Sequence, residues 1–159
     1  MGTITETLFD GLGHATQVWV GTTAGLTETE SEQYDNNGVG DGDLTQEIQY
    51  TNARTPNHVT LLYYDWRDRL VAQNNGLQLT YNTLDNLGEI TESDVYSAAF
   101  AGTVLSMANG VPQPPAEAGG LLAKTTTAFD NQVLGVMGGS ITPAAALSYT
   151  QTNQGTPVG

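Results

Sequence analysis

The stretch 58–81 decides the fold class, and it reads HVTLLYYDWRDRLVAQNNGLQLTY. Its first part, 58–72, is rich in valine, leucine, tyrosine and tryptophan, which favour strands. Asn75-Gly76 follows, and Asn-Gly between two β-prone runs is the strongest short-range signal for a hairpin turn. In 77–81 the apolar residues recur at every second position, as they do in a half-buried strand. We therefore predict a β-hairpin over this stretch.

The first arm of this hairpin carries a cluster of aromatic and basic residues. If 58–72 is one strand, alternation places two sets on opposite faces: Leu62, Tyr64, Trp66 and Leu70 on one, and Leu61, Tyr63, Arg67 and Arg69 on the other. We expect the first face to be core and the second to contact another subunit. Tyrosine, tryptophan and arginine are enriched at interface hot spots, so the candidate interface residues are Tyr63, Tyr64, Trp66, Arg67 and Arg69.

The rest of the chain predicts further short strands joined by turns. We expect a mainly β fold: a small β-sandwich or barrel-like domain at 15–149, with long loops and extended termini. The arm would be 1–14 and the tail 150–159. Further strands are expected at 15–21, 47–52, 101–107, 121–127 and 132–137, and a long acidic loop at 22–43. The segment 91–100 predicts either a helix capped by Thr91 or Ser93, or a turn.

Composition restricts the partners that this chain can have. Seventeen acids against four bases give a net charge of −13 in 159 residues. Such a surface repels phosphate backbones and anionic lipids, so we expect no nucleic-acid partner and no membrane partner. No apolar run approaches the roughly 18 residues that a membrane-spanning helix needs, and the first residues do not resemble a secretory signal. Cysteine is absent, which excludes disulfides and thiolate metal sites.

Motifs for catalysis are weak throughout the sequence. His14 and His58 do not form a metal-binding spacing, and no nucleophile elbow or phosphate-binding loop occurs. Asp65 and Asp68 could suggest a glycosidase pair, but in one strand they would point to opposite faces. Asp41 and Asp43 could form a cation site outside the EF-hand pattern, against the simpler reading of a solvated turn. We expect no catalytic residue, no metal and no cofactor.

The C-terminal part resembles a known family. Ala101-Gly102-Thr103-Val104-Leu105-Ser106, Asn109-Gly110, residues 122–127 and residues 130–136 follow a recurring pattern. The pattern is similar to that of head decoration proteins of tailed viruses, the lambda-type family, and of some tail-fibre modules. This resemblance covers the segment 101–140. It implies a small β-rich fold, no catalysis, and trimers seated on the capsid surface.

The functional expectation is therefore a viral structural protein. We expect a capsid decoration, or cement, subunit in the virion that contacts the major capsid protein and copies of itself, as a homotrimer without a ligand pocket. The alternative is a receptor-binding tail-fibre or adhesin module, with a concave carbohydrate site built from Tyr63, Tyr64 and Trp66. A tail, adaptor or cell-surface-layer component is a third possibility.

Overall fold

A computed structural model describes residues 2–37, 40–52, 55–97, 105–115, 120–128 and 149–154. These residues form twelve strands and one 3-10 turn, η1 (Asp35–Asn37). The strands are β1 (Ile4–Phe9), β2 (Ala15–Thr22), β3 (Gly25–Tyr34), β4 (Leu44–Asn52), β5 (Thr55–Tyr64), β6 (Leu70–Asn74), β7 (Leu79–Leu84), β8 (Ile90–Tyr96), β9 (Met107–Ala108), β10 (Val111–Pro112), β11 (Leu121–Ala128) and β12 (Tyr149–Gln154). The expected mainly β fold is confirmed. No helix among these residues is long and apolar enough to cross a membrane.

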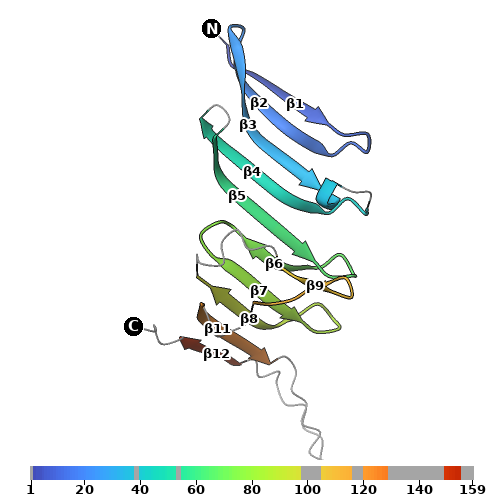
Figure 1. Cartoon of the computed structure of the whole chain (residues 1–159), viewed down its shortest axis with the longest axis vertical. Coiled ribbons are helices and arrows are strands. Elements are labelled where there is room, and N and C mark those ends of the chain that lie inside the picture. The colour runs from blue at the N-terminus through green and yellow to red at the C-terminus, as the bar shows by residue number, and fades with distance from the viewer. Residues whose placement is uncertain are drawn as a thin grey trace, which may run out of the picture.

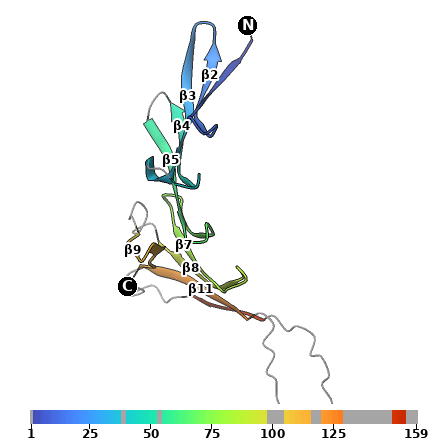
Figure 2. The ribbon, with the colours of Figure 1, turned by 90° about the vertical axis from the view of Figure 1, so that its right-hand side faces the viewer.

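Ten strands form one open antiparallel sheet (Figure 1). Its order is β1-β2-β3-β4-β5-β6-β7-β8-β11-β12, so each strand up to β8 pairs with the next one in the chain. β9 and β10 form a separate two-stranded ribbon. Seen edge-on, the large sheet is one thin, twisted layer, and β9 lies on one side of it (Figure 2). The described strands therefore build an open sheet with a small cover, in place of the expected sandwich or barrel.

Three segments expected to be irregular contain strands of the sheet. The expected tail 150–159 begins within β12, which pairs with β11. The expected N-terminal arm contains β1, which pairs with β2 from Ile4↔Gly21 onward. The expected 22–43 loop contains β3, which pairs with both β2 and β4. Alternation of threonine and glutamate in β3 gave no apolar stripe from which to predict it, because neither face of this strand is deeply buried. Backbone pairing with β2 on one side and β4 on the other holds β3 in the sheet although it has no apolar stripe.

The hairpin predicted around Asn75-Gly76 is confirmed, and it joins β6 to β7. Gly76 has a positive φ of 79°, a conformation that glycine adopts without strain. The prediction of one strand over 58–72 is wrong, because a tight loop at residues 65–69 separates β5 from β6. Alternation along one strand therefore does not place Trp66, Arg67 and Arg69, which all belong to this loop.

In the C-terminal part of the chain, the predicted turn and one predicted strand are confirmed, whereas the helix considered there is not found in the described residues. The helix considered for 91–100 is absent over its described part, because Ile90–Tyr96 is strand β8. The predicted strand at 121–127 is confirmed as β11, and Asn109-Gly110 forms the turn of the β9–β10 ribbon, both residues having positive φ. The predicted strand 132–137, the start of the predicted strand 101–107, half of the decoration-like segment 101–140 and the end of the 150–159 tail lie outside the described residues.

The core lies where the ribbon covers the sheet. Two cross-strand rows face it. One runs Tyr63, Ala72, Tyr81, Asp94, Lys124, and the other runs Leu61, Asn74, Leu79, Tyr96, Leu121. Ala72, Leu79 and Tyr96 are at most 1% exposed and pack with Leu105. The Tyr81 hydroxyl donates to the Pro112 carbonyl, 2.9 Å away, and thereby ties the ribbon to the sheet. We call this side of the sheet the ribbon face.

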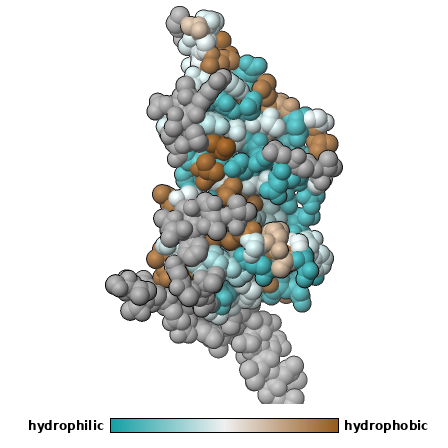
Figure 3. Space-filling view, viewed as in Figure 1, coloured by the Kyte–Doolittle hydropathy of each residue, from teal (hydrophilic) through white to brown (hydrophobic). Residues whose placement is uncertain are grey.

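The first half of the sheet has no comparable cover among the residues that the structure describes. Among the side chains whose burial the structure describes, every buried one lies at or beyond Thr60, and none lies in 2–36 or 40–51. The side chains of β2 are half-buried along its whole length. On the surface seen in Figure 3, hydrophobic residues are scattered among hydrophilic ones and form no single large patch. β1–β4 is thus held mainly by strand pairing.

Candidate functional site

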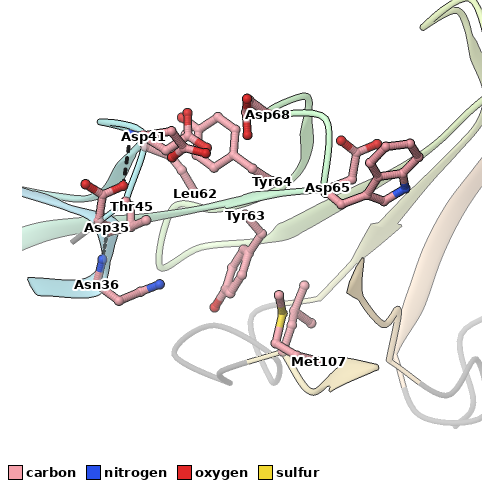
Figure 4. Close-up of a pocket in the computed structure, with 14 residues that line it drawn as sticks. Asp35, Asn36, Asp41, Thr45, Leu62, Tyr63, Tyr64, Asp65, Asp68 and Met107 are labelled. Atoms are coloured by element: carbon pink, nitrogen blue, oxygen red, sulfur yellow. Dashed lines mark hydrogen bonds between the residues drawn. The ribbon is translucent and has the colours of Figure 1, made fainter. Parts of the chain in front are cut away.

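A hollow of about 550 Å³ opens where β5 ends (Figure 4). Three parts of the chain line it: the loop between β3 and β4, the end of β5 with the loop that follows, and the residues at the start of the ribbon. Its polar lining is dominated by carboxylates, namely Asp35, Asp41, Asp43, Asp65 and Asp68. Its apolar and aromatic lining includes Leu62, Tyr63, Tyr64, Trp66, Leu105 and Met107.

The two tyrosines of the hollow lie on opposite sides of β5, as strand alternation requires. Tyr63 lies with Met107 on the ribbon face, whereas Tyr64 lies near Asp41 and Asp68 on the other side (Figure 4). Burial raises the pKa of Tyr63, and a hydrogen bond with the backbone of Leu105 opposes this shift. Burial, and then the charge of Asp43, raise the pKa of Tyr64. The hollow therefore has an apolar side and an acidic side.

Asp65 organises the loop that separates these two sides. Its carboxylate accepts hydrogen bonds from the backbone N–H groups of Arg67 (2.9 Å) and Arg69 (3.2 Å). The Arg69 guanidinium donates to the same carboxylate through Nε (2.8 Å) and Nη2 (2.6 Å). Burial alone would raise the pKa of Asp65, but these hydrogen bonds outweigh it and hold that pKa below 3.8. The Asp65 carboxylate therefore stabilises the 65–69 loop.

The same loop recurs twice at this end of the sheet. In the loops that begin at Asp10, Asp65 and Asp85, the backbone N–H of the first residue donates to the backbone carbonyl of the fifth residue. The backbone carbonyl of the first residue accepts from the N–H of the fourth. Its carboxylate accepts from the third and fifth N–H groups. These bonds hold the pKa values of Asp10 and Asp85 below their usual range as well, the largest cause being the N–H of the fifth residue. The three loops share one architecture because an aspartate directly follows the strand in each case. We call them the Asp loops.

Sequence reasoning missed this repeat, although the sequence carries a signal for it. Phe9-Asp10, Tyr34-Asp35, Tyr64-Asp65 and Leu84-Asp85 each mark the end of an odd-numbered strand. The fourth residue of the three short loops has a positive φ, and it is glycine in two of them, Gly13 and Gly88. In the third loop it is Asp68, with φ 58°. An aspartate therefore occupies the one position where its sister loops use glycine, and its side chain reaches the hollow.

Asp41, Asp43 and Asp68 bring three carboxylates together. One oxygen from each lies within 4.8 Å of the others. A hydrogen bond between Asp41 and Asp68 is the largest cause of both their shifts: it lowers the pKa of Asp41 and raises that of Asp68. Burial, followed by the charges of Asp41 and Asp35, raises the pKa of Asp43. Such an oxygen set could hold a hard cation, although Ca²⁺ usually takes about six to eight oxygen ligands.

The structure distributes the five candidate interface residues unevenly. Tyr63, Tyr64 and Trp66 line the hollow, and Trp66 is 67% exposed. The Arg67 guanidinium stacks over the Trp66 ring at 4.5 Å and donates to the Asn86 carbonyl. Arg69 joins Asp65 to the Asp85 carbonyl through a 2.7 Å hydrogen bond from Nη1. The two arginines therefore link neighbouring loops and do not share a strand face with Tyr63.

The two histidines lie apart from the hollow's lining. His14 stacks on Tyr34, with ring centroids 4.5 Å apart, and its Nδ1 lies 2.9 Å from Asp10 Oδ2. These contacts join the first Asp loop to β3. His58 lies on β5 opposite Gln49.

In chemical terms, the hollow offers carboxylates and aromatic rings side by side. Carboxylates bind ammonium, guanidinium and metal cations, and aromatic faces attract cations and stack on planar groups. Such a set is suited to binding. The sequence matches no protein-family model, and no curated protein is significantly similar to it.

Proposed function

We propose that this chain is a non-catalytic structural protein that works by making contacts in a larger assembly. The observation that carries the proposal is the uncovered first half of the sheet. A stretch running from residue 2 to residue 52 without a buried residue, among those described, gains little from apolar burial on its own. Docking against a neighbour would supply that burial, and mass action would then stabilise the assembled state.

The specific form we propose is a capsid decoration subunit, as the resemblance of 101–140 implies. A cement protein adds stability to a shell by burying surface at joints between capsomers, without chemistry. An open sheet suits this task, because the faces of β1–β4 and the outer edge of β1 are uncovered among the described residues and could meet the major capsid protein or another copy. β1 pairs with β2 alone, so its outward N–H and C=O groups could accept a further strand.

The test is to add the purified chain to shells that lack it, prepared from the virus that encodes it. Binding that protects the shells from heat supports the proposal. Hydrogen exchange should then slow in β1–β4 more than in β6–β8, because the first half is the part that lacks cover. Failure to bind at the salt concentration of the native particle would count against it.

The hollow itself favours the second candidate, a receptor-binding module. That hypothesis predicts a concave site using Tyr63, Tyr64 and Trp66, and all three line the hollow. A glycan array tests it directly with the full chain. A saturable signal that disappears in Trp66→Ala, and survives in the matched aromatic variant Phe9→Ala outside the hollow, would favour receptor binding over shell contacts. Phe9 is similarly exposed, at 62%.

A further inference from the structure

The side of the sheet opposite the ribbon carries an unusual concentration of negative charge. Cross-strand pairing places Glu32 directly opposite Glu47, and Glu30 lies on the same side, two residues along β3. Like charges directly opposite each other destabilise an antiparallel pair. Burial, and then the charges of Glu32 and Glu47, raise the pKa of Glu30. We call this side, defined by Glu30, Glu32 and Glu47, the acidic face.

The acidic side of the hollow extends this face. Thr60 pairs with Glu47, so Leu62 and Tyr64, at every second position along β5, lie on the same side as Glu47. Asp41 and Asp68 lie next to Tyr64 on that side (Figure 4). Six carboxylates therefore face one direction: Glu30, Glu32, Glu47, Asp41, Asp43 and Asp68.

A tyrosine hydroxyl binds one of these carboxylates, but it is neutral and does not cancel the negative charge. The Tyr34 hydroxyl donates to Glu32 over 2.9 Å, and burial together with that bond raises the pKa of Tyr34 to about 12. The two arginines and the lysine that the structure describes interact elsewhere. Arg67 stacks on Trp66, Arg69 binds Asp65, and Lys124 pairs with Glu92 and Asp94. No described arginine or lysine therefore relieves the repulsion on the acidic face. The histidines on this side are His58, in the cross-strand row with Glu30, and His14, stacked on Tyr34.

We propose that the acidic face is a docking surface for a basic, extended segment of a partner protein. The proposal rests on the structural role proposed above and names the chemistry of the partner. Charge complementarity selects the occupant: arginine or lysine side chains would neutralise carboxylates that now repel one another. Two positions along a strand span about 6.6 Å, so an extended segment with a base at every second residue matches the Glu30–Glu32 spacing.

Other occupants fit the face less well. A second copy of the chain carries a net charge of −13 and would add to the repulsion. One metal ion could contact only the three aspartates of the hollow, since Glu30, Glu32 and Glu47 lie on β3 and β4 away from the oxygens that converge there. Arginine is favoured over lysine because its planar guanidinium binds a carboxylate through two parallel hydrogen bonds and also stacks on aromatic rings such as Tyr64.

The experiment measures binding of the peptide acetyl-Arg-Thr-Arg-Thr-Arg-amide to the full chain by calorimetry and by NMR shifts. Its comparison peptide replaces each arginine with citrulline, which keeps the shape and removes the charge. We expect the arginine peptide to bind at least tenfold more tightly, and its affinity to fall as salt rises. The shifted amides should be those of β3, β4 and the 65–69 loop.

Two matched double variants locate the surface. Glu30→Gln/Glu47→Gln removes two charges from the acidic face. Glu6→Gln/Glu28→Gln removes two charges from the opposite side of β1 and β3, where both residues pair with Trp19. The register shift between Val18 and Trp19 turns Glu28 to the side opposite Glu30. We expect the first to weaken peptide binding about tenfold or more and the second less than twofold. Equal binding of the citrulline peptide would overturn the proposal, as would equal loss in the two variants. So would Ca²⁺ or a neutral glycan producing these shifts where the arginine peptide does not.

The same two variants separate this inference from the proposed function. If both bind shells as the unsubstituted chain does, the acidic face is not the docking surface, while the structural role stands. If the chain binds the arginine peptide as expected but binds no shell, the surface stands and the decoration role fails.

Discussion

The two halves of the sheet are built from the same strands and loops, yet they are stabilised differently. β5–β11 has a ribbon over one face and buries Ala72, Leu79 and Tyr96. β1–β4 has the same antiparallel pairing and an equivalent Asp loop, but none of its described residues is buried. Strand pairing and turn chemistry are therefore sufficient to shape a sheet, whereas a core needs a second layer. The difference places the described buried core in one half and leaves the other half without a covering layer.

The largest expected effect tests where the core lies. Leu79 is fully buried under the ribbon, so Leu79→Ala should lower the free energy of unfolding by about 2–5 kcal/mol. Ile48→Ala, at a half-buried position of β4, should cost roughly 1 kcal/mol or less, because less apolar area is lost from contact. Urea unfolding followed by circular dichroism measures both. Equal losses would show that the first half has a core of its own.

The second effect tests the Asp loops. Asp65→Asn removes the charge that Arg69 and two backbone N–H groups bind at a nearly buried carboxylate, and should cost roughly 2–4 kcal/mol. Asp10→Asn changes the equivalent residue of the first half, where the partner is His14 and solvent has access, and should cost less. The same urea titration compares them. A larger loss for Asp10→Asn would contradict the difference between the halves.

A third expectation concerns pH, and its sign differs between Asp65 in one half and Glu30 in the other. The lowered pKa of Asp65 means that its contribution is present above 3.8 and is lost as pH falls through its folded pKa. The raised pKa of Glu30 means the opposite: the folded state binds its proton more tightly, so stability increases as pH falls through that raised pKa toward 4.5. Hydrogen exchange, corrected for its intrinsic pH dependence, should show β3–β4 gaining protection as pH falls from 7 toward 4.5.

The pH experiment has an internal control. Glu30→Gln removes the titrating group, so most of the gain in β3–β4 should disappear in that variant. The amides of β6 and β7 should be nearly unchanged over the same range, because the group that titrates lies in the other half. A gain of protection in β6 and β7 that equals the gain in β3–β4 would mean that the whole sheet responds as one unit.

The smallest expected effect concerns Asp68. Asp68→Gly places glycine at a positive φ, as in the two sister loops, and removes a carboxylate that faces Asp41 and Asp43. We expect a small increase in the urea midpoint. The reciprocal change, Gly88→Asp at the same loop position, should lower it. A decrease for Asp68→Gly would mean that the carboxylate makes a favourable contact that outweighs both the strain and the repulsion.

The sequence predicted features that depend on neighbouring residues. The Asn75-Gly76 hairpin and the strands at 15–21, 47–52 and 121–127 follow from local turn chemistry and β propensity. Sequence reasoning did not predict strand β3, because its alternating polar residues form no apolar stripe. It also did not predict the 65–69 loop, because aromatic and apolar residues around it favour a continuous strand. The 65–69 loop is closed by the Asp65 carboxylate, which binds backbone N–H groups of the loop. An aspartate predicts a turn less strongly than a glycine does.

What the sequence determined by itself is the β class, the two Asn-Gly turns and a surplus of negative charge, because each depends on composition or on residues close in the chain. Only the tertiary structure decided which face is covered and which carboxylates converge. Asp41 and Asp68 belong to different loops, and they meet because β3–β4 and β5–β6 turn at the same end of the sheet. Distance in space depends on strand order, and no local pattern encodes that order.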